Sequence, residues 1–311
     1  MGAWAVERTG LENQQGFLPF VGSNPTPSAI FLIMDKRIFN KQIIIKNYSI
    51  ENSITYDNDI NKNFLYGKET KNFVKKITLN EKDKIIADIG SGTGYVFEIL
   101  TKKYRKKEMN LFGIEPANGM LKIARKKIKD NRVKFVKGRF EKISLKNNSV
   151  DKIISTLALH WADSIDNGLK ELKRIIKPNG SINILMIEKN DGKEFKKIVF
   201  KVMKKFLNHK QIFNAANLIN RITKKELMFK FQKYFDLRNE YTLVIKNKRK
   251  KIYWTPEQHI KWWKARSFQM ISEVKDKELF INTLKNELNK YKKKKGIVFD
   301  LSLLEINLLR K

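Results

Sequence analysis

The sequence contains no cysteine and only three histidines, His160, His209 and His259, among 311 residues. The lack of cysteine excludes disulfides, thiolate metal sites and cysteine nucleophiles. No two histidines have the spacing of a metal-ligand pair, so we expect no metal site. No apolar run reaches the roughly 18 residues that a membrane-spanning helix requires, so we expect no membrane span. The N-terminus lacks a basic start followed by an apolar region, and we expect a cytoplasmic protein.

Basic residues, in contrast, are abundant. The 65 Lys and Arg against 32 Asp and Glu give a formal net charge of +33. Such a charge is typical of proteins that bind nucleic acid or an anionic membrane. A lysine-rich proteome encoded by an AT-rich genome would give the same balance, with the lysines on solvated faces. The cations are spread from Lys36 to Lys311, so nucleic acid is an alternative partner and not the favoured one. The oligomeric state is not indicated.

Residues 1–33 differ from the rest of the chain. They contain no lysine, three of the six prolines and four of the 15 glycines, and they show neither helical nor strand periodicity. A DNA string that could encode residues 22–29 resembles the end of a tRNA gene. We therefore expect residues 1–33 to be a non-core extension, disordered or absent from the native protein, with translation starting at Met34.

The remaining chain predicts three parts: N-terminal helices or a lid over residues 34–80, a ligand-binding core over 81–190, and completion of the sheet with an inserted substrate cap over 191–311. Short apolar runs alternate with helix-like segments from residue 84, which predicts a parallel sheet with helices on both faces. The expected strands are 84–89, 111–114, 133–137, 150–155, 181–186, 237–246 and 297–308. The expected helices are 95–103, 117–128, 169–176, 194–207, 224–232 and 276–291. Residues 208–221 are expected to be an insertion, 248–251 a basic loop, and 255–257 a helix start.

The first of these strands ends in Asp88-Ile89-Gly90-Ser91-Gly92-Thr93-Gly94. Glycine lets the backbone approach a ligand without a Cβ in the way, and α/β sheets bind ligands at the carboxyl ends of their strands. The dinucleotide fingerprint would require a glycine at position 95, where this chain has Tyr95. No Gly-Lys-Ser/Thr of a Walker loop follows. The turn therefore suits a small nucleoside ligand without a diphosphate.

This run resembles the first motif of the class I S-adenosylmethionine-dependent methyltransferases with a type 11 domain. The second strand ends at Glu115, and residues 115–121 are similar to the family's E/D-P-S-x-x-M-L. The resemblance covers about residues 35–190. It implies a Rossmann-like sheet of seven strands with the last strand antiparallel, helices on both faces and a helical cap, and S-adenosyl-L-methionine as the cofactor. The implied cofactor contacts are Asp88, Gly90, Ser91, Gly92, Gly94, Glu115, Pro116, Met120, Arg139, Phe140 and Thr156.

The resemblance also implies individual roles. Glu115 would accept hydrogen bonds from the ribose hydroxyls, and Asp88 would help to fix the loop and the methionine amino group. The adenine would lie between side chains near Met120 and Phe140. The sequence departs from the family at Arg139, where an aspartate usually binds the adenine amino group. An arginine offers no acceptor, and it could stack on the adenine face instead.

Residues 155–161 resemble the Ser-x-x-x-Leu-His-Trp of the trans-aconitate and malonyl carrier-protein methyltransferase branch. His160 is a candidate base or hydrogen-bond partner of the acceptor, or a histidine satisfied by the sheet edge. We expect Trp161 to wall the active site.

A tryptophan-then-arginine segment caps the substrate pocket in that branch. Trp263 and Arg266 are therefore candidate acceptor contacts, together with Tyr56 in the lid. The alternative is that Trp263 is a packing residue and Arg266 a surface charge.

The expected reaction is methyl transfer to a small acceptor, with a carboxylate oxygen favoured. A carboxylate is already ionised at neutral pH, so positioning can supply much of the rate without a base. Two alternatives stay open: an RNA or protein methyltransferase that uses the basic surface, and an inactive methyltransferase-like assembly factor. Methylation at base C5 is excluded because it needs a cysteine nucleophile.

Overall fold

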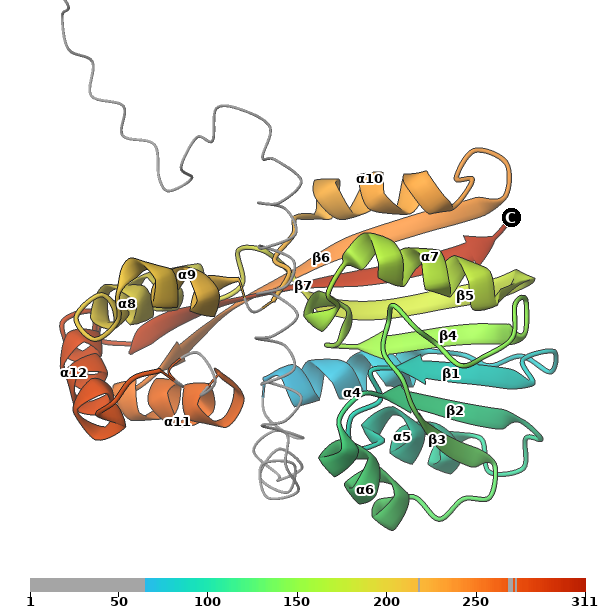
Figure 1. The fold of residues 1–311 in the computed structure, drawn as a ribbon, viewed down its shortest axis with the longest axis horizontal. Coiled ribbons are helices and arrows are strands. Elements are labelled where there is room, and N and C mark those ends of the chain that lie inside the picture. The colour runs from blue at the N-terminus through green and yellow to red at the C-terminus, as the bar shows by residue number, and fades with distance from the viewer. Residues whose placement is uncertain (1–64, 218, 268–270, 272) are drawn as a thin grey trace, which may run out of the picture. The chain divides into compact units, whose positions relative to one another are not determined.

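The computed structural model describes residues 65–217, 219–267, 271 and 273–311. The expectations for residues 1–33 and for the lid up to residue 64, including Tyr56, lie outside the described residues. The described part is built on a seven-stranded sheet in the order β3-β2-β1-β4-β5-β7-β6 (Figure 1). The strands are β1 (Ile85–Ile89), β2 (Asn110–Glu115), β3 (Val133–Lys137), β4 (Val150–Thr156), β5 (Ile176–Ile187), β6 (Tyr241–Trp254) and β7 (Ile297–Arg310). The helices are α4 (Tyr66–Lys76), α5 (Tyr95–Lys103), α6 (Asn118–Lys127), α7 (Ile165–Ile175), α8 (Lys193–Met203), α9 (His209–Ala216), α10 (Lys224–Tyr234), α11 (Pro256–Ser267) and α12 (Lys277–Asn289), with a 3-10 turn η1 (Leu159–Trp161).

The pairing of the strands confirms the predicted fold class. The four ladders among β1 to β5 are parallel, and β7 runs antiparallel to both β5 and β6. The carboxyl ends of β1, β2, β4 and β5 therefore lie at one edge of the sheet, where the sequence placed the ligand site.

Both faces of the sheet are buried, as alternating strand geometry requires. Ile153 of β4 faces a cluster with α7 and α10, whereas its neighbour Ile154 faces a cluster with α4, α5 and α8. Helix α7 begins at Ile165, four residues before the predicted start, because the Ser164 hydroxyl accepts the Asn167 N–H and caps it. Strand β5 begins at Ile176, before the predicted start at residue 181, and residues 177–180 form an irregularity in it where the register with β4 shifts.

Strands β6 and β7 continue past the rest of the sheet as a two-stranded ribbon. Pairing between β5 and β7 ends at Ile187 opposite Leu303, whereas β6 stays paired with β7 as far as Trp254 opposite Ile297. The prediction of a basic loop at residues 248–251 is therefore wrong, since all four residues lie in this ladder. A run of cations hides the strand pattern in the sequence, but it is compatible with an exposed edge strand.

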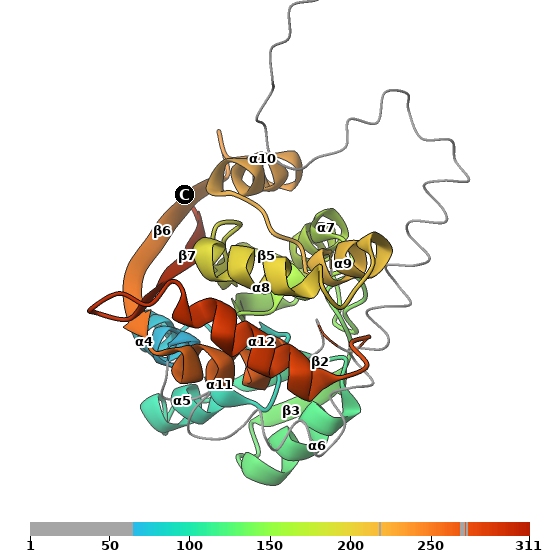
Figure 2. The same cartoon turned by 90° about the vertical axis from the view of Figure 1, so that its left-hand side faces the viewer.

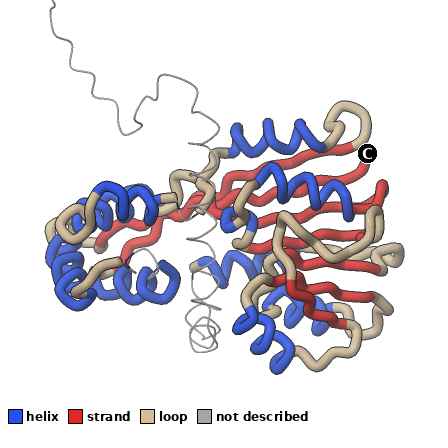
Figure 3. The backbone as a smooth tube through the Cα atoms, in the orientation of Figure 1, coloured by secondary structure: helices blue, strands red, loops and turns tan. Residues whose placement is uncertain are grey.

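The ribbon leads to the helical cap, which consists of α8, α9, α11 and α12 (Figure 2). Figure 3 shows the ribbon running from the sheet into this group of helices. The predicted helix start at residues 255–257 is confirmed, because the Thr255 hydroxyl accepts the Gln258 N–H at 3.3 Å. The predicted insertion at residues 208–221 contains α9, which begins with a capping box formed by Asn208 and Gln211.

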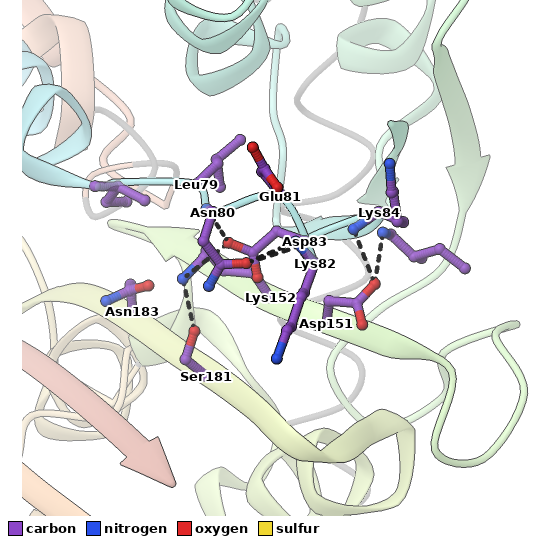
Figure 4. Close-up of polar contacts among 12 residues, drawn as sticks. Leu79, Asn80, Glu81, Lys82, Asp83, Lys84, Asp151, Lys152, Ser181 and Asn183 are labelled. Carbon is purple, nitrogen blue, oxygen red and sulfur yellow. Dashed lines mark hydrogen bonds and ion pairs between the residues drawn. The ribbon is translucent and has the colours of Figure 1, made fainter. Parts of the chain in front are cut away.

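A buried lysine joins three segments at the edge of the sheet opposite the carboxyl ends of the parallel strands (Figure 4). The Lys152 ammonium on β4 donates to the Ser181 hydroxyl at 2.7 Å and lies 3.8 Å from the Asp83 carboxylate. Asp83 in turn accepts the Asn80 N–H, which closes the turn before β1. Burial lowers the pKa of Lys152, while the charge of Asp83 opposes that change.

Replacing Lys152 by methionine is expected to lower the free energy of unfolding by roughly 3 kcal/mol, because it leaves the Asp83 carboxylate buried without its counter-charge. Urea denaturation of the variant measures this loss. Adding Asp83→Asn to Lys152→Met is expected to restore part of the stability by removing that stranded charge. A single variant as stable as the original protein would contradict the assignment.

Candidate active site at the carboxyl edge of the sheet

The glycine turn after β1 has the conformation that its sequence predicts. Gly90, Gly92 and Gly94 adopt positive φ angles of 76°, 52° and 81°, which other residues rarely adopt. The N–H groups of Gly90 and Ser91 both donate to the Ile114 carbonyl, at 2.8 and 3.0 Å. The turn is thus tied to the end of β2, which delivers Glu115.

Gly90 and Gly92 differ in their surroundings. A Cβ at Gly90 would lie 2.2 Å from the Cβ of Ala158, which follows β4. A Cβ at Gly92 would meet no atom within 4 Å. The turn therefore packs tightly on β4 at Gly90 and leaves open space at Gly92.

Gly90→Ala is expected to destabilise the protein by about 2–4 kcal/mol, because an overpacked methyl adds to the cost of a positive φ. Gly92→Ala is the matched control and should lose only about 1 kcal/mol, since it carries the φ cost alone. Denaturant unfolding of both variants without added ligand separates the cost of overpacking from the cost of a positive φ. Equal losses would contradict the close approach to Ala158.

Glu115 closes the turn from the second strand. Its Oε2 accepts the Gly92 N–H at 3.0 Å, and its Oε1 accepts the Ala117 N–H at 2.9 Å. Burial raises the pKa of Glu115 to about 7, and the two backbone donors oppose that rise. Each carboxylate oxygen keeps a second lone pair for a further donor, so Glu115 can still accept hydrogen bonds from ligand hydroxyls. Its predicted role at the ribose stays a prediction.

Asp88 lies at the end of β1 and is fully buried. Neither carboxylate oxygen has a hydrogen-bond partner within the described residues. Burial, followed by the charge of Glu115, raises the pKa of Asp88 well above its usual value. The Asp88 carboxylate makes no hydrogen bond to the glycine turn, whose N–H groups donate to the Ile114 carbonyl and to Glu115. Its predicted role toward an amino group stays a prediction.

Four other predicted cofactor residues lie at or after the carboxyl ends of β2, β3 and β4. Met120 on α6 and Phe140 are buried, and Pro116 and Thr156 are half-buried at the ends of β2 and β4. Whether Met120 and Phe140 bracket an adenine stays a prediction.

The Arg139 guanidinium forms an ion pair with Asp163. Its Nη1 donates to Asp163 Oδ2 at 3.0 Å, and its Nε lies 3.9 Å from Glu141 Oε2. Glu141 Oε1 also accepts the Asp163 and Ser164 N–H groups. Stacking of Arg139 on an adenine would have to coexist with these contacts.

His160 and Trp161 lie in η1, directly after β4. His160 is buried and Trp161 half-buried, with ring centroids 5.7 Å apart. The sequence therefore placed this pair correctly at the carboxyl edge of the sheet. Its roles in catalysis stay predictions.

No group of three or more His, Asp or Glu side chains in the described ranges has the arrangement of a metal site. None of the helices described is long and apolar enough to cross a bilayer.

Residues 87–184, which include the glycine turn, Glu115 and η1, match the family model of a methyltransferase domain. This chain therefore contains a methyltransferase domain over residues 87–184. It is 29% identical to a malonyl-[acyl-carrier protein] O-methyltransferase of Priestia megaterium, over 47% of this chain and 51% of that protein. It is 30% identical to the ubiquinone/menaquinone biosynthesis C-methyltransferase UbiE of Campylobacter jejuni, over 36% of this chain and 48% of that one. The chain thus spans about half the length of these two relatives.

Solved structures share the fold of the methyltransferase domain. The YcgJ protein of Bacillus subtilis matches with a TM-score of 0.54 at 14% identity, over 78% of this chain and 99% of that one. Phosphoethanolamine N-methyltransferase 2 of Haemonchus contortus, in complex with S-adenosyl-L-methionine, matches with a TM-score of 0.54 at 14% identity. That match covers 85% of this chain and 57% of the other. These two likenesses concern the fold alone.

The predicted acceptor contacts of the methyltransferase domain receive less support. Trp263 is 3% exposed and stacks on Phe280 of α12 within the cap, with ring centroids 5.9 Å apart. This favours the packing role that the sequence left as the alternative. The Arg266 side chain and Tyr56 lie outside the described residues.

Sequence reasoning missed a charged group beside the methyltransferase domain. Asp191 follows β5, and its carboxylate accepts the Tyr66 hydroxyl and the Ser302 N–H. Arg221 precedes α10, and its charge interacts with that of Asp191 through space. A lone arginine in an irregular segment has no sequence signature, and only the fold brings these residues together.

Proposed function

We propose that this protein transfers a methyl group from S-adenosylmethionine to a small carboxylic acid. The observation that carries the cofactor assignment is the buried Asp88 carboxylate, unpartnered among the described residues, beneath a turn that leaves open space at Gly92. A buried charge without a partner is costly, and a cationic ligand at the turn would offset that cost. The amino and sulfonium groups of S-adenosylmethionine supply such positive charge.

The residues of the turn have separable tasks in this proposal. Glu115 holds the Gly92 N–H and presents its free lone pairs to the ribose hydroxyls. Gly90 has no Cβ and so lets the turn approach Ala158 closely. When bound, the cofactor supplies an electrophilic methyl: the acceptor oxygen forms a C–O bond as the C–S bond breaks, and the electron pair stays on sulfur.

The carboxylate acceptor rests on two supports. One is chemical, because an ionised carboxylate needs only orientation and the exclusion of water to react. The other is the activity of the Priestia megaterium relative, which is a malonyl-[acyl-carrier protein] O-methyltransferase. His160 and Trp161 lie at the edge of the sheet that this acceptor would face.

A transfer assay with methyl-labelled S-adenosylmethionine tests the proposal. Small mono- and dicarboxylic acids, acyl carrier protein and total RNA serve as acceptors. We expect label on an acid and its release as methanol in mild alkali, which cleaves carboxyl methyl esters but leaves N- and C-methyl groups intact. Label that resists alkali would overturn O-methylation of a carboxylate.

An RNA methyltransferase is the second candidate, favoured by the exposed cations along the edge strand. Lys246, Arg249, Lys250 and Lys251 are all exposed on β6. Turnover of RNA should fall steeply between low and physiological salt because binding releases counterions, whereas turnover of a small acid should change little. Cofactor binding without transfer to any acceptor would instead indicate the inactive assembly factor.

A further inference from the structure

Three segments meet at the carboxyl edge of the sheet, beside η1. The Asn220 N–H donates to the His160 carbonyl at 2.7 Å, which ties the segment before α10 to η1. Two residues later, the Ile222 carbonyl accepts the Lys189 N–H at 3.0 Å, which ties it to the loop after β5. Arg221 lies between these two attachments. Its backbone therefore bridges the carboxyl ends of β4 and β5, next to His160.

The acidic residues of this junction already have their hydrogen bonds. Glu188 accepts the Asn190 N–H at 2.8 Å and the Ser302 hydroxyl at 3.0 Å. Asp191 accepts the Tyr66 hydroxyl and the Ser302 N–H. Both carboxylates are almost fully buried. Their role is therefore to join α4, the loop after β5 and β7.

The hydrogen-bond donors of the two cations at the junction, Arg221 and Lys196, have fewer partners. Arg221 is half-buried, and its guanidinium donates no hydrogen bond within the described residues, although it interacts with Asp191 through space. Among the described residues, half-buried Lys196 of α8 donates only to the Lys189 carbonyl, at 3.3 Å. Burial, together with the neighbouring charge of Arg221, lowers the pKa of Lys196 to about 7, while the charges of Asp191 and Glu188 oppose that change. The Arg221 guanidinium therefore keeps N–H donors that no acceptor among the described residues uses, although the charge of Asp191 lies near it.

We infer that Arg221, supported by Lys196, is the binding subsite for the carboxylate of the acceptor. This inference rests on the proposed function and specifies its substrate class at a new place in the chain. A guanidinium presents parallel N–H groups that match a carboxylate, and a bound anion would complete the unused donors. The attachment of Asn220 to His160 would hold the acid close to the edge of the sheet from which the glycine turn projects.

Equilibrium binding of hexanoate, with hexanamide as the neutral analogue, tests this subsite without requiring turnover. Ligand-observed NMR on the full chain, with S-adenosylhomocysteine present, gives both affinities. Arg221→Gln is expected to weaken hexanoate binding at least about 10-fold, the scale of a charge-assisted hydrogen bond, and to leave hexanamide unchanged. Arg221→Lys should fall between, since it keeps the charge but loses the fork. Lys193→Gln, which removes an exposed cation from the same helix as Lys196, is the matched control and should bind hexanoate normally.

The outcomes separate the subsite from the proposed function. Failure of hexanoate to bind the unmodified protein, or equal binding to Arg221→Gln, overturns the subsite even if acids are methylated. Loss of hexanoate binding in Arg221→Gln, without methyl transfer to any acid, keeps the subsite and overturns the function. Thermal melting shows whether Arg221→Gln folds, and Arg221→Lys carries the comparison if it does not.

Discussion

Replacing Asp88 by asparagine is expected to stabilise the cofactor-free protein while weakening its affinity for S-adenosylmethionine. The Asp88 carboxylate is buried without a partner among the described residues, so its ionisation costs more in the folded state than in the unfolded state. A neutral amide avoids that cost, and we expect a gain of about 1–2 kcal/mol near pH 8. The cofactor should bind roughly 10-fold more weakly, because its positive groups lose a counter-charge.

The stability of wild type and that of Asp88→Asn should depend differently on pH. The pKa of Asp88 is raised by burial, so wild type loses stability as pH rises above the ordinary value of about 4 and through the folded pKa. Asp88→Asn does not share this loss. The difference in melting temperature between the two proteins should therefore grow as pH rises.

Asp83→Asn is the matched control, since Asp83 is also buried but lies 3.8 Å from the Lys152 ammonium. That variant should be less stable than wild type because it leaves the buried Lys152 ammonium without its counter-charge. Parallel melting profiles of wild type and Asp88→Asn across this pH range would show that Asp88 stays satisfied, and would remove it as the cofactor's counter-charge.

Replacing Glu115 by alanine should weaken S-adenosylmethionine binding by about 1.5–3 kcal/mol, the scale of hydrogen bonds to a charged group. The loss has two sources, the ribose contacts and the anchor on the Gly92 N–H. Isothermal titration calorimetry measures the affinity. An unchanged affinity would refute the ribose assignment.

Glu115→Gln separates the charge of this residue from its shape. The pKa of Glu115 is raised to about 7 in the free protein. If the cofactor prefers the ionised carboxylate, wild-type affinity should rise as pH increases from 6 to 8, and the glutamine variant should lack this component. A glutamine variant with the same pH dependence as wild type would assign the titration to another group.

The sequence predicted the elements whose signals are local. The strand ends at Asp88 and Glu115, the glycine turn and the helix start at Thr255 all follow from short patterns of apolar, acidic and small residues. The position of His160 after β4 follows from the same alternation. The cofactor half of the domain was therefore largely predictable.

The acceptor half was not predictable for physical reasons. Lys248 and its neighbours form a strand because β7 offers them a partner from a distant part of the chain, which periodicity alone cannot reveal. Arg221 acquires its setting from contacts with η1 and the loop after β5. Trp263 packs on Phe280 although its sequence context suggested a pocket. Each depends on tertiary contacts between segments far apart in sequence.

The ribbon of β6 and β7 also has an evolutionary consequence. The cap enters the chain as two separate segments, one between β5 and α10 and the other between the distal ends of β6 and β7. Insertions, deletions or exchanges within either segment leave the ladders of β1 to β5 in register. The cap of such a chain can therefore diverge by recombination at these junctions while strands β1 to β5 keep their pairing.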